Sequence, residues 1–274
     1  MKKALNAWTV DPQAGFEQMF ADVKAAGFDG IELNVDREDA SNHCLTLSTD
    51  EAGLAAVRAL SERYALPVVS ISTSLWGGRM GADDEFSGQL LARQLQYAAA
   101  LGATGILTVP GGGYPGIPLL EARAGGVRFL RSQRALIESF GLYVGVENVW
   151  NGFFTSPLDM AGFIDAVECP LVGAYFDVGN VTAFSWPERW IEVLGGRIHH
   201  VHVKDFKRNR GINSGGTWVD VGEGDVDWKA VVSAFGAIGF DGFLTGEVSR
   251  RDPEQPYGDY YAYVARGIDG ALRR

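Results

Sequence analysis

Eight short apolar segments alternate with longer segments of helical periodicity along the 274 residues, and this alternation constrains the fold more than any other feature. The predicted strands are residues 3–9, 29–35, 67–73, 104–109, 142–148, 171–177, 197–204 and 242–247. Most are continuous apolar runs, as expected for parallel strands that are covered on both faces. Apolar residues at three- and four-residue spacing predict helices at 14–26, 50–64, 86–101, 119–140, 157–167, 187–194, 228–238 and 257–272.

A repeated join between helix and strand supports a chain built from βα units. Residues 26–30 read Ala-Gly-Phe-Asp-Gly, and residues 238–242 read Ile-Gly-Phe-Asp-Gly. In each copy a glycine ends the helix and the next residues lead into a strand. No GxGxxG motif follows the first strand, which argues against an open dinucleotide-binding sheet. The fold expected is α/β, a single (β/α)8 TIM barrel over residues 1–274, because such barrels commonly need about 250 residues.

Charge and composition narrow the partners. A net charge of −10 does not attract nucleic acid or anionic membranes. No stretch approaches the roughly 20 apolar residues of a membrane span. The two cysteines, Cys44 and Cys169, have no zinc-knuckle or disulfide-framework spacing and fit a reducing compartment. The N-terminal apolar run is too interrupted for a signal peptide, so a cytoplasmic protein is expected.

Four consecutive predicted strands in the second half of the chain carry metal-binding side chains near their ends. These are Glu147, Asp177, His202 and Glu247. The C-terminal ends of barrel strands form one rim, so the four side chains are expected to converge there. Three carboxylates and one imidazole suit one divalent ion; Mn²⁺ is expected, with Mg²⁺, Co²⁺ and Zn²⁺ as alternatives.

Each of these residues also has a plainer interpretation. A strand-end glutamate such as Glu147 is commonly a solvated rim charge, and Asp177 precedes Gly-Asn in a possible turn. Alternation places His200 and His202 on one face of their strand and His199 on the other, which leaves His199 as a structural residue. The coincidence of four strands favours the metal site over these separate explanations.

The motifs around these residues resemble the sugar phosphate isomerase/epimerase superfamily, the xylose isomerase-like barrels. The resemblance covers the whole chain and is best over 144–247, in VGVEN, FDVGN, HVHVKD, VGEGDVDW and GFLTGE. It implies that Glu147, Asp177, His202 and Glu247 hold the ion and that both glutamates act as acid and base. The expected reaction moves a proton beside a sugar carbonyl through an enediolate. The family's substrate-contacting arginine would fall on Arg208.

Two positions depart from the ketose 3-epimerase branch of that superfamily. Asn180 stands where the branch often has histidine, and Phe153 stands where it has a second acidic residue. Other segments look closer to pentulose- or hexulose-phosphate epimerases, so the sugar, its phosphorylation, and isomerisation versus epimerisation stay open.

Two other functions on this scaffold remain as alternatives. A lyase or dehydratase acting on a keto-sugar or keto-glycoside would need the same metal and base, because it also forms an enediolate. A sugar- or metal-binding barrel without activity is the other. An apurinic endonuclease is disfavoured, because four histidines and an acidic balance do not suit a trinuclear zinc cluster and a basic groove.

Further substrate contacts are expected from neighbouring strand ends. Glu32, taken as a strand-end residue, would bond a sugar hydroxyl, with a solvated rim charge as the alternative. The indole faces of Trp8 and Trp76 would pack on sugar C–H groups, with a place in the core as the alternative. Lys204 would orient His202 or meet an anionic group, and Asn180 would make supporting hydrogen bonds.

Three further expectations concern the rest of the molecule. The glycines at 111–113 are expected to form a loop, with substrate contact as the alternative. His43 is expected at the surface. Aromatic residues such as Trp186 could contribute to an interface between copies of the chain, and the resemblance to the superfamily implies a homodimer or homotetramer.

Overall fold

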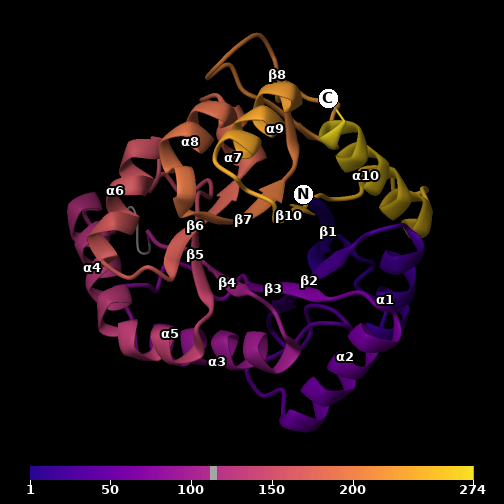
Figure 1. The fold of residues 1–274 in the computed structure, drawn as a ribbon, viewed down its shortest axis with the longest axis horizontal. Helices are drawn as coiled ribbons and strands as arrows, with labels where there is room; N and C mark the ends of the chain where they lie inside the picture. The colour runs from indigo at the N-terminus through magenta and orange to yellow at the C-terminus, as the bar shows by residue number, and fades with distance from the viewer. Residues whose placement is uncertain (112–115, 274) are drawn as a thin grey trace.

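The chain folds into a closed barrel of eight parallel strands, as the sequence predicted (Figure 1). The computed structural model describes residues 1–111 and 116–273. The barrel strands are β1 (Lys2–Asn6), β2 (Gly30–Val35), β3 (Val68–Thr73), β4 (Gly105–Thr108), β5 (Tyr143–Glu147), β6 (Val172–Asp177), β7 (Ile198–Val203) and β10 (Phe243–Gly246). Around the barrel their order is β1-β10-β7-β6-β5-β4-β3-β2, and β1 closes the ring by pairing with β2.

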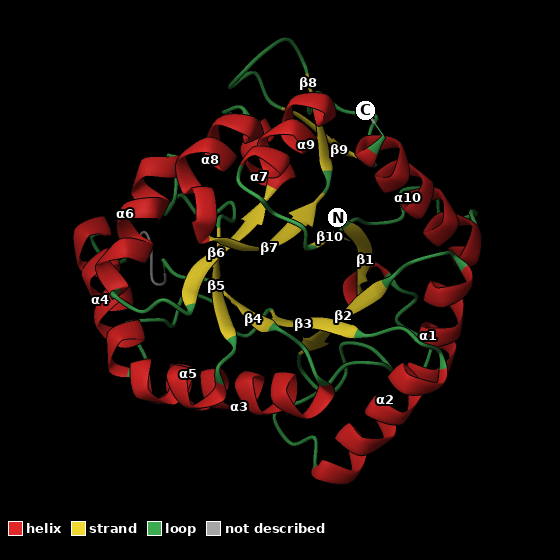
Figure 2. Ribbon diagram, viewed as in Figure 1, coloured by secondary structure: helices red, strands yellow, loops and turns green. Residues whose placement is uncertain are grey.

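Helices form an outer ring around the strands (Figure 2). They are α1 (Phe16–Ala25), α2 (Glu51–Arg63), α3 (Asp84–Leu101), α4 (Leu119–Ser132), α5 (Arg134–Phe140), α6 (Pro157–Val167), α8 (Pro187–Leu194), α9 (Trp228–Ala237) and α10 (Tyr257–Leu272). Local signals set their ends: Asp50 caps α2 by accepting from Gly53 N, and Gly102 ends α3 in the left-handed region at φ 75°. Within the described ranges, no helix combines the length and apolarity needed to cross a bilayer.

The apolar core lies mainly between the strands and the helices, while the inside of the barrel is rich in polar groups. Phe176 of β6 faces outward and stacks on Trp190 of α8, with ring centroids 6.2 Å apart. The residue before it, Tyr175, points inward and bonds to Ser70 and Glu32. Because side chains alternate along a strand, one face of β6 builds the core and the other supports the site.

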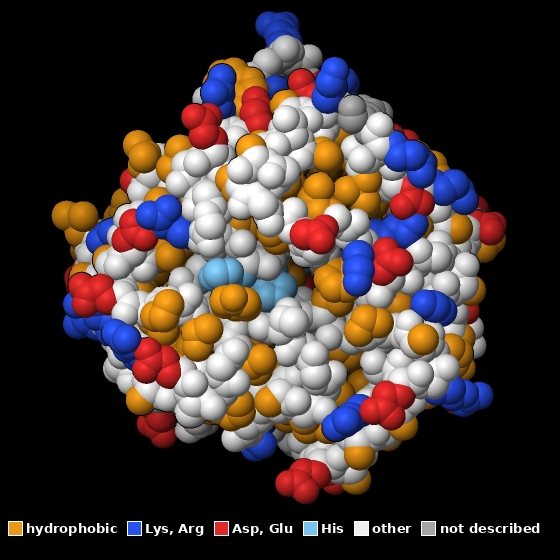
Figure 3. All heavy atoms as spheres, viewed as in Figure 1, with side chains coloured by type: hydrophobic (Ala, Val, Ile, Leu, Met, Phe, Trp, Pro, Cys, Tyr) orange, Lys and Arg blue, Asp and Glu red, His pale blue; other side chains and the backbone are white. Residues whose placement is uncertain are grey.

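Figure 3 shows the face on which the barrel strands begin. Histidine side chains lie near its centre. His202 and His43 are buried, whereas His199 is partly exposed at the start of β7, where its ring stacks on Tyr143 with centroids 3.9 Å apart. Acidic and basic side chains are mixed on this face (Figure 3).

Four details differ from the sequence prediction. The first strand ends at Asn6 rather than residue 9, because the Asn6 side chain accepts from Trp8 N and starts the 3₁₀ turn η1 (Ala7–Thr9). The predicted helix 119–140 is divided into α4 and α5 at Gln133, whose φ of −89° and ψ of 0° break the helical repeat. Glu32 is not a strand-end residue, since β2 continues to Val35. His43 is buried rather than exposed, and its ring nitrogens lie 2.8 Å from Ala14 O and 3.1 Å from Ala7 O.

Three short elements were not predicted. They are the helix α7 (Val178–Thr182) and a hairpin of β8 (Asp205–Arg208) with β9 (Gly216–Val219). The strands of the hairpin are four residues each and half polar, so they carry no apolar run that could be recognised. Of the glycines at 111–113, residues 112 and 113 lie outside the described ranges.

The carboxylate of Asp205 holds the hairpin and the loop that follows it. This buried side chain accepts from Phe206 N at 2.9 Å, Gly222 N at 3.0 Å, Val226 N at 3.2 Å and Trp228 Nε1 at 2.9 Å. These contacts join the segments HVHVKD and VGEGDVDW, since the aspartate of the first accepts hydrogen bonds from Gly222, Val226 and Trp228 of the second.

Replacing Asp205 by asparagine should therefore lower the melting temperature by about 5–10 °C, because an amide presents a donor where only donors face it. Thermal denaturation followed by circular dichroism measures the change. The exposed Asp39→Asn variant serves as the control and should melt within about 2 °C of the wild type. A melting temperature for Asp205→Asn equal to that of the control would contradict this role.

Candidate metal centre

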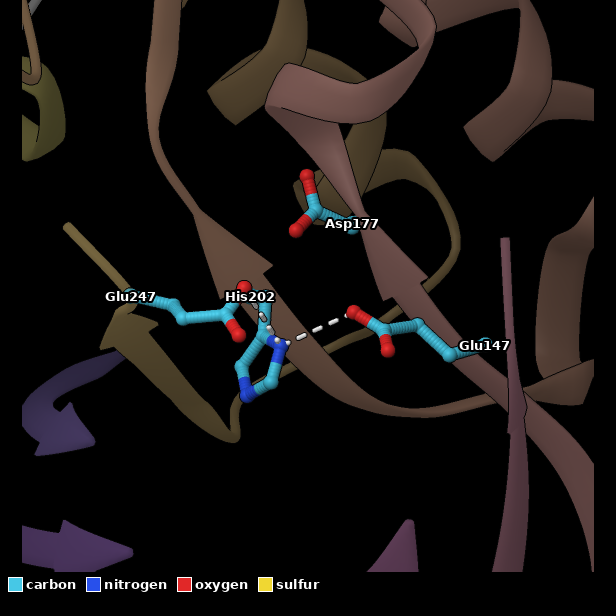
Figure 4. A group of neighbouring side chains, drawn as sticks. All are labelled: Glu147, Asp177, His202 and Glu247. Atoms are coloured by element: carbon cyan, nitrogen blue, oxygen red, sulfur yellow. Dashed lines mark hydrogen bonds and ion pairs between the residues drawn. The ribbon is translucent and has the colours of Figure 1, made fainter. Parts of the chain in front are cut away.

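Glu147, Asp177, His202 and Glu247 come together at the C-terminal mouth of the barrel, as the sequence predicted (Figure 4). Glu147 and Asp177 are the last residues of β5 and β6, His202 is the fifth residue of β7, and Glu247 directly follows β10. One potential ligand atom from each residue lies within 4.8 Å of those of the other three. The parallel register accounts for the convergence, since it places Asp177 beside His202 on adjacent strands.

The imidazole of His202 lies between the two glutamates. Its Nδ1 is 3.1 Å from Glu147 Oε1 and 3.5 Å from Glu247 Oε2, and Figure 4 shows the glutamates approaching it from opposite sides. His202 and Asp177 are fully buried, whereas Glu247 keeps 20% of its side chain exposed. The cluster is thus closed below and open toward the mouth at Glu247.

The other ring nitrogen of His202 is fixed by Glu32. His202 Nε2 lies 2.8 Å from Glu32 Oε1, and Asn6, Ser70 and Tyr175 also donate to this carboxylate. Although burial alone would raise it, His202 holds the pKa of Glu32 down at about 2. An ionised Glu32 keeps the proton on Nε2 and leaves Nδ1 to act as a ligand.

Lys204 brings a positive charge to the open side of the cluster. Its Nζ lies 3.0 Å from Asp177 Oδ2 and 2.5 Å from Glu247 Oε2. The contact to Asp177 is an ion pair without hydrogen-bond geometry, so the buried Asp177 Oδ2 accepts no hydrogen bond among the described residues. Although burial lowers it, the carboxylates of Asp177 and Glu247 raise the pKa of Lys204 above its usual value.

The pKa values of the carboxylates are pushed apart. Burial raises the pKa of Glu147 to about 7 and also raises that of Asp177. For Glu247 burial acts in the same direction, but Lys204 and His202 outweigh it and lower the pKa. Buried carboxylates with raised pKa values gain from a nearby cation.

The backbone of Asp177 is held by the side chain of Asn148. Asn148 Nδ2 donates to Asp177 O at 2.9 Å, and Asp177 N donates to Asn148 Oδ1 at 2.8 Å. Asp177 Oδ1 in turn accepts from Asn180 N at 2.7 Å and so caps α7. One oxygen of Asp177 is thereby committed to the helix and the other is left for the cluster.

The donor set fits a divalent metal ion. Even with His202 protonated, the four carboxylates of Glu32, Glu147, Asp177 and Glu247 outnumber the two cationic groups within the cluster. Asp177 Oδ2 has no hydrogen-bond donor in the part of the chain that the structure describes, and Nδ1 of His202 points at the carboxylates. Carboxylate oxygens with one imidazole nitrogen are ligands that Mn²⁺, Mg²⁺, Co²⁺ or Zn²⁺ accept.

The residues predicted to contact the substrate differ in burial and in the groups to which they bond. Trp8 lies at the mouth with 41% of its surface exposed, whereas Trp76 is buried and its Nε1 donates to Leu107 O at 3.2 Å. Arg208 donates to Thr182 O at 2.6 Å and Ser185 O at 2.8 Å, so its guanidinium supports the chain after β6. Asn180 contacts the cluster through its backbone, and its carbonyl accepts from Trp150 Nε1.

Sequence reasoning missed the inner partners of Glu32 and one aromatic residue of the mouth. Asn6, Ser70 and Tyr175 sit at inward positions of predicted strands, so the two-residue alternation of those strands could have identified them. Trp218 belongs to the unpredicted hairpin.

Two cavities open beside the centre. The larger, of about 610 Å³, reaches both glutamates and is lined by Trp8, Thr73, Ser74, Trp76, Gly77, Gly78, Leu107, Val109, Gly111, Glu147, Val149, Asn151 and Glu247. The second, of about 350 Å³, lies toward the hairpin and is lined by Trp8, Lys204, Trp218, Val219, Asp220, Glu247, Val248, Ser249 and Arg251. Trp8 and Glu247 belong to both, so the two cavities meet above the four candidate ligands.

A protein-family model described as a xylose isomerase-like TIM barrel matches residues 20–266. The chain belongs to this family. The resemblance seen in the sequence motifs is thereby confirmed, and the four ligand candidates all lie inside the matched range.

Solved structures share the fold over the whole length of this xylose isomerase-like barrel. A D-allulose 3-epimerase from Methylomonas sp. aligns with a TM-score of 0.76 and 19% identity, covering 99% of this chain and 98% of that one. A 3-keto-D-glucoside 4-epimerase from E. coli aligns with a TM-score of 0.73 and 19% identity, covering 97% and 99%. The IOLI protein, whose crystal structure holds a zinc atom, aligns with a TM-score of 0.79 and 17% identity, covering 99% and 98%.

Matches to curated sequences are shorter. The two curated relatives align over 118 and 70 residues, so the aligned part spans 39% and 24% of their lengths. At these levels of similarity the comparisons establish family and fold, and the chemistry has to be argued from the site.

The Glu32 contact predicts an effect on metal affinity. Glu32→Gln should weaken binding of Mn²⁺ by 10- to 100-fold (order of magnitude), because the amide no longer holds the proton on Nε2 of His202. Isothermal titration calorimetry measures the affinity, and circular dichroism confirms folding. The exposed Glu51→Gln variant is the control. A folded Glu32→Gln protein that binds Mn²⁺ as tightly as the control would show that Glu32 does not position the ligand.

Proposed function

We propose that this protein is a divalent-metal-dependent isomerase or epimerase of a sugar, with Glu147 and Glu247 as acid and base. The observation that carries the proposal is the placement of two glutamates on opposite sides of one metal-binding cluster, at the floor of a cavity of about 610 Å³. Glu147, Asp177, His202 and Glu247 would hold the ion, for which Mn²⁺ is our first choice. The chain belongs to a family described as a xylose isomerase-like TIM barrel, and two solved structures with a similar fold are named as sugar epimerases.

Bound at this position, the ion would polarise a substrate carbonyl and stabilise the negative charge that develops when a neighbouring C–H proton leaves. The carbon acid is otherwise too weak for a carboxylate to deprotonate at a useful rate. The chain itself has to supply the proton acceptor, the proton donor and the orientation of the sugar.

The two glutamates can act on opposite faces of the same carbon. Glu147 projects from the end of β5 and Glu247 from the end of β10, with His202 Nδ1 between them at 3.1 and 3.5 Å. One glutamate, ionised, removes the proton, and the other, in its protonated form, gives a proton to the far side of the carbon, which inverts the centre. Return to the neighbouring carbon would instead interconvert an aldose and a ketose.

Side chains around the cavity can orient the sugar. Thr73, Ser74 and Asn151 provide hydroxyl and amide groups, and the indole of Trp8 provides an exposed apolar face. Burial of Glu147 keeps bulk water away from one of the two reacting carboxylates. Fixed polar groups and excluded water are what proton transfer at a carbon requires.

Solvent exchange tests the proposal directly. The wild-type protein with Mn²⁺ should incorporate deuterium from D₂O into the carbon beside the carbonyl of its sugar substrate, as read by NMR across a panel of ketoses, ketose phosphates and keto-glycosides. Glu147→Gln and Glu247→Gln should each lower the rate by about 10²- to 10⁴-fold, the usual contribution of an acid or base. The exposed Glu121→Gln variant is the control and should retain full activity.

The product spectrum separates this proposal from its alternative. A lyase or dehydratase would release water from the sugar and give an unsaturated or deoxy product, whereas an epimerase or isomerase gives a product of unchanged mass. Exchange that persists in both glutamine variants would overturn the assignment of the glutamates.

A further inference from the structure

The mouth of the barrel is larger than the chemistry at the glutamates requires. Even if each of the twelve heavy atoms of a hexose received the volume of a liquid water molecule, the sugar would fill roughly 360 Å³. The cavity above Glu147 and Glu247 already measures about 610 Å³, and the adjoining cavity beside the hairpin adds about 350 Å³. A single sugar ring placed against the two glutamates therefore leaves most of the second cavity unfilled, although Trp8 and Glu247 line both cavities.

Two exposed indoles line this second cavity. Trp8 and Trp218 keep 41% and 38% of their surfaces exposed, and both belong to its lining. Large aromatic side chains usually bury more than this in a folded chain, and exposed ones that share a concave surface commonly mark a binding site.

Both indoles are held in place before any ligand arrives. Trp8 Nε1 donates to Asp36 Oδ2 at 3.2 Å, and the ring of Trp218 packs edge-on against Phe206 with centroids 5.1 Å apart. Trp150 also contacts Trp218, with centroids 4.8 Å apart. Fixed indole faces offer apolar surface to the C–H side of a sugar ring at little entropic cost.

The charges around the two cavities do not suit a phosphate. The larger cavity has no lysine or arginine in its described lining. In the second, Lys204 is paired with Asp177 and Glu247, and Arg251 NH2 lies 2.8 Å from Asp220 Oδ2 and 2.6 Å from Glu223 Oε2. Since each cation already has two carboxylate partners, an added phosphate would have to displace them.

We propose that the natural substrate is an uncharged glycoside rather than a free sugar or a sugar phosphate. Its keto-sugar ring lies over the metal-binding side chains, and a second ring, linked to it glycosidically, occupies the cavity between Trp8 and Trp218. The proposal rests on the proposed function for the assignment of the first ring, while the second ring is assigned from the second cavity alone. Ser249 lies at that cavity and can meet a hydroxyl of the second ring.

Binding of unreactive sugars tests the second cavity without relying on turnover. Isothermal titration of the Mn²⁺-loaded protein compares glucose and glucose 6-phosphate with the disaccharides cellobiose, maltose, trehalose and sucrose. At least one disaccharide should bind about 10-fold more tightly than glucose, and glucose 6-phosphate should show no such gain.

Substitutions test whether the tighter binding of disaccharides depends on the second cavity. Trp218→Ala should abolish the disaccharide preference, whereas Trp218→Phe, which retains an aromatic face, should keep most of it. Trp186 is also exposed but belongs to neither cavity, so Trp186→Ala is the matched control and should leave the preference intact. Mn²⁺ affinity measured on each variant checks that the centre itself is undisturbed.

Two results would overturn the inference: disaccharides that bind no better than glucose, or a preference that survives Trp218→Ala. Tighter binding of glucose 6-phosphate than of every disaccharide would likewise exclude an uncharged second ring. Failure of the proposed function is distinguishable, because a preserved disaccharide preference without deuterium exchange would leave the two-part site standing and remove only the isomerase chemistry.

Discussion

The burial of four carboxylates around one point is the constraint on which the site depends. Glu32, Glu147, Asp177 and Glu247 face only the imidazole of His202 and the ammonium of Lys204 as cationic partners in the described cluster. Buried charges are stable only when they are paired, and removing one partner commonly costs about 3–5 kcal/mol because the other charge is then left uncompensated. A divalent cation bound among these side chains would offset the excess of negative charge.

The polar interior links that cluster to closure of the barrel. Glu32 on β2 collects hydrogen bonds from Asn6 on β1, Ser70 on β3, Tyr175 on β6 and His202 on β7. Five strands thus contribute to the orientation of a single imidazole. Because its interior is polar, the barrel gains less stability from burial of apolar side chains there. The apolar core between the strands and the helices offsets this loss.

Above the cluster, Trp8 and the hairpin that carries Trp218 limit which ligands can reach it. Asp205 anchors the hairpin that carries Trp218, and Asp36 fixes Trp8 on the opposite wall. These two contacts have no role in holding the ion, yet they shape the space around Glu247. The division between a conserved type of chemistry at the strand ends and variable recognition in the loops is common in barrels of this kind.

Much of this arrangement could be predicted from the sequence. The eight barrel strands and the convergence of Glu147, Asp177, His202 and Glu247 follow from apolar runs that end in ligand-type residues, and both are present in the structure. The role of Glu32 was less predictable, because it depends on which inward-facing groups share a layer of the barrel. The hairpin escaped prediction because its register is set by the distant side chain of Asp205 rather than by its own short polar strands.

The most direct test is a crystal structure of the protein with Mn²⁺, in which anomalous scattering locates the ion. We expect one peak bonded to carboxylate oxygens of Glu147, Asp177 and Glu247 and to Nδ1 of His202. A peak bonded through Nε2 of His202, a peak elsewhere, or no ordered ion at saturating Mn²⁺ would contradict it.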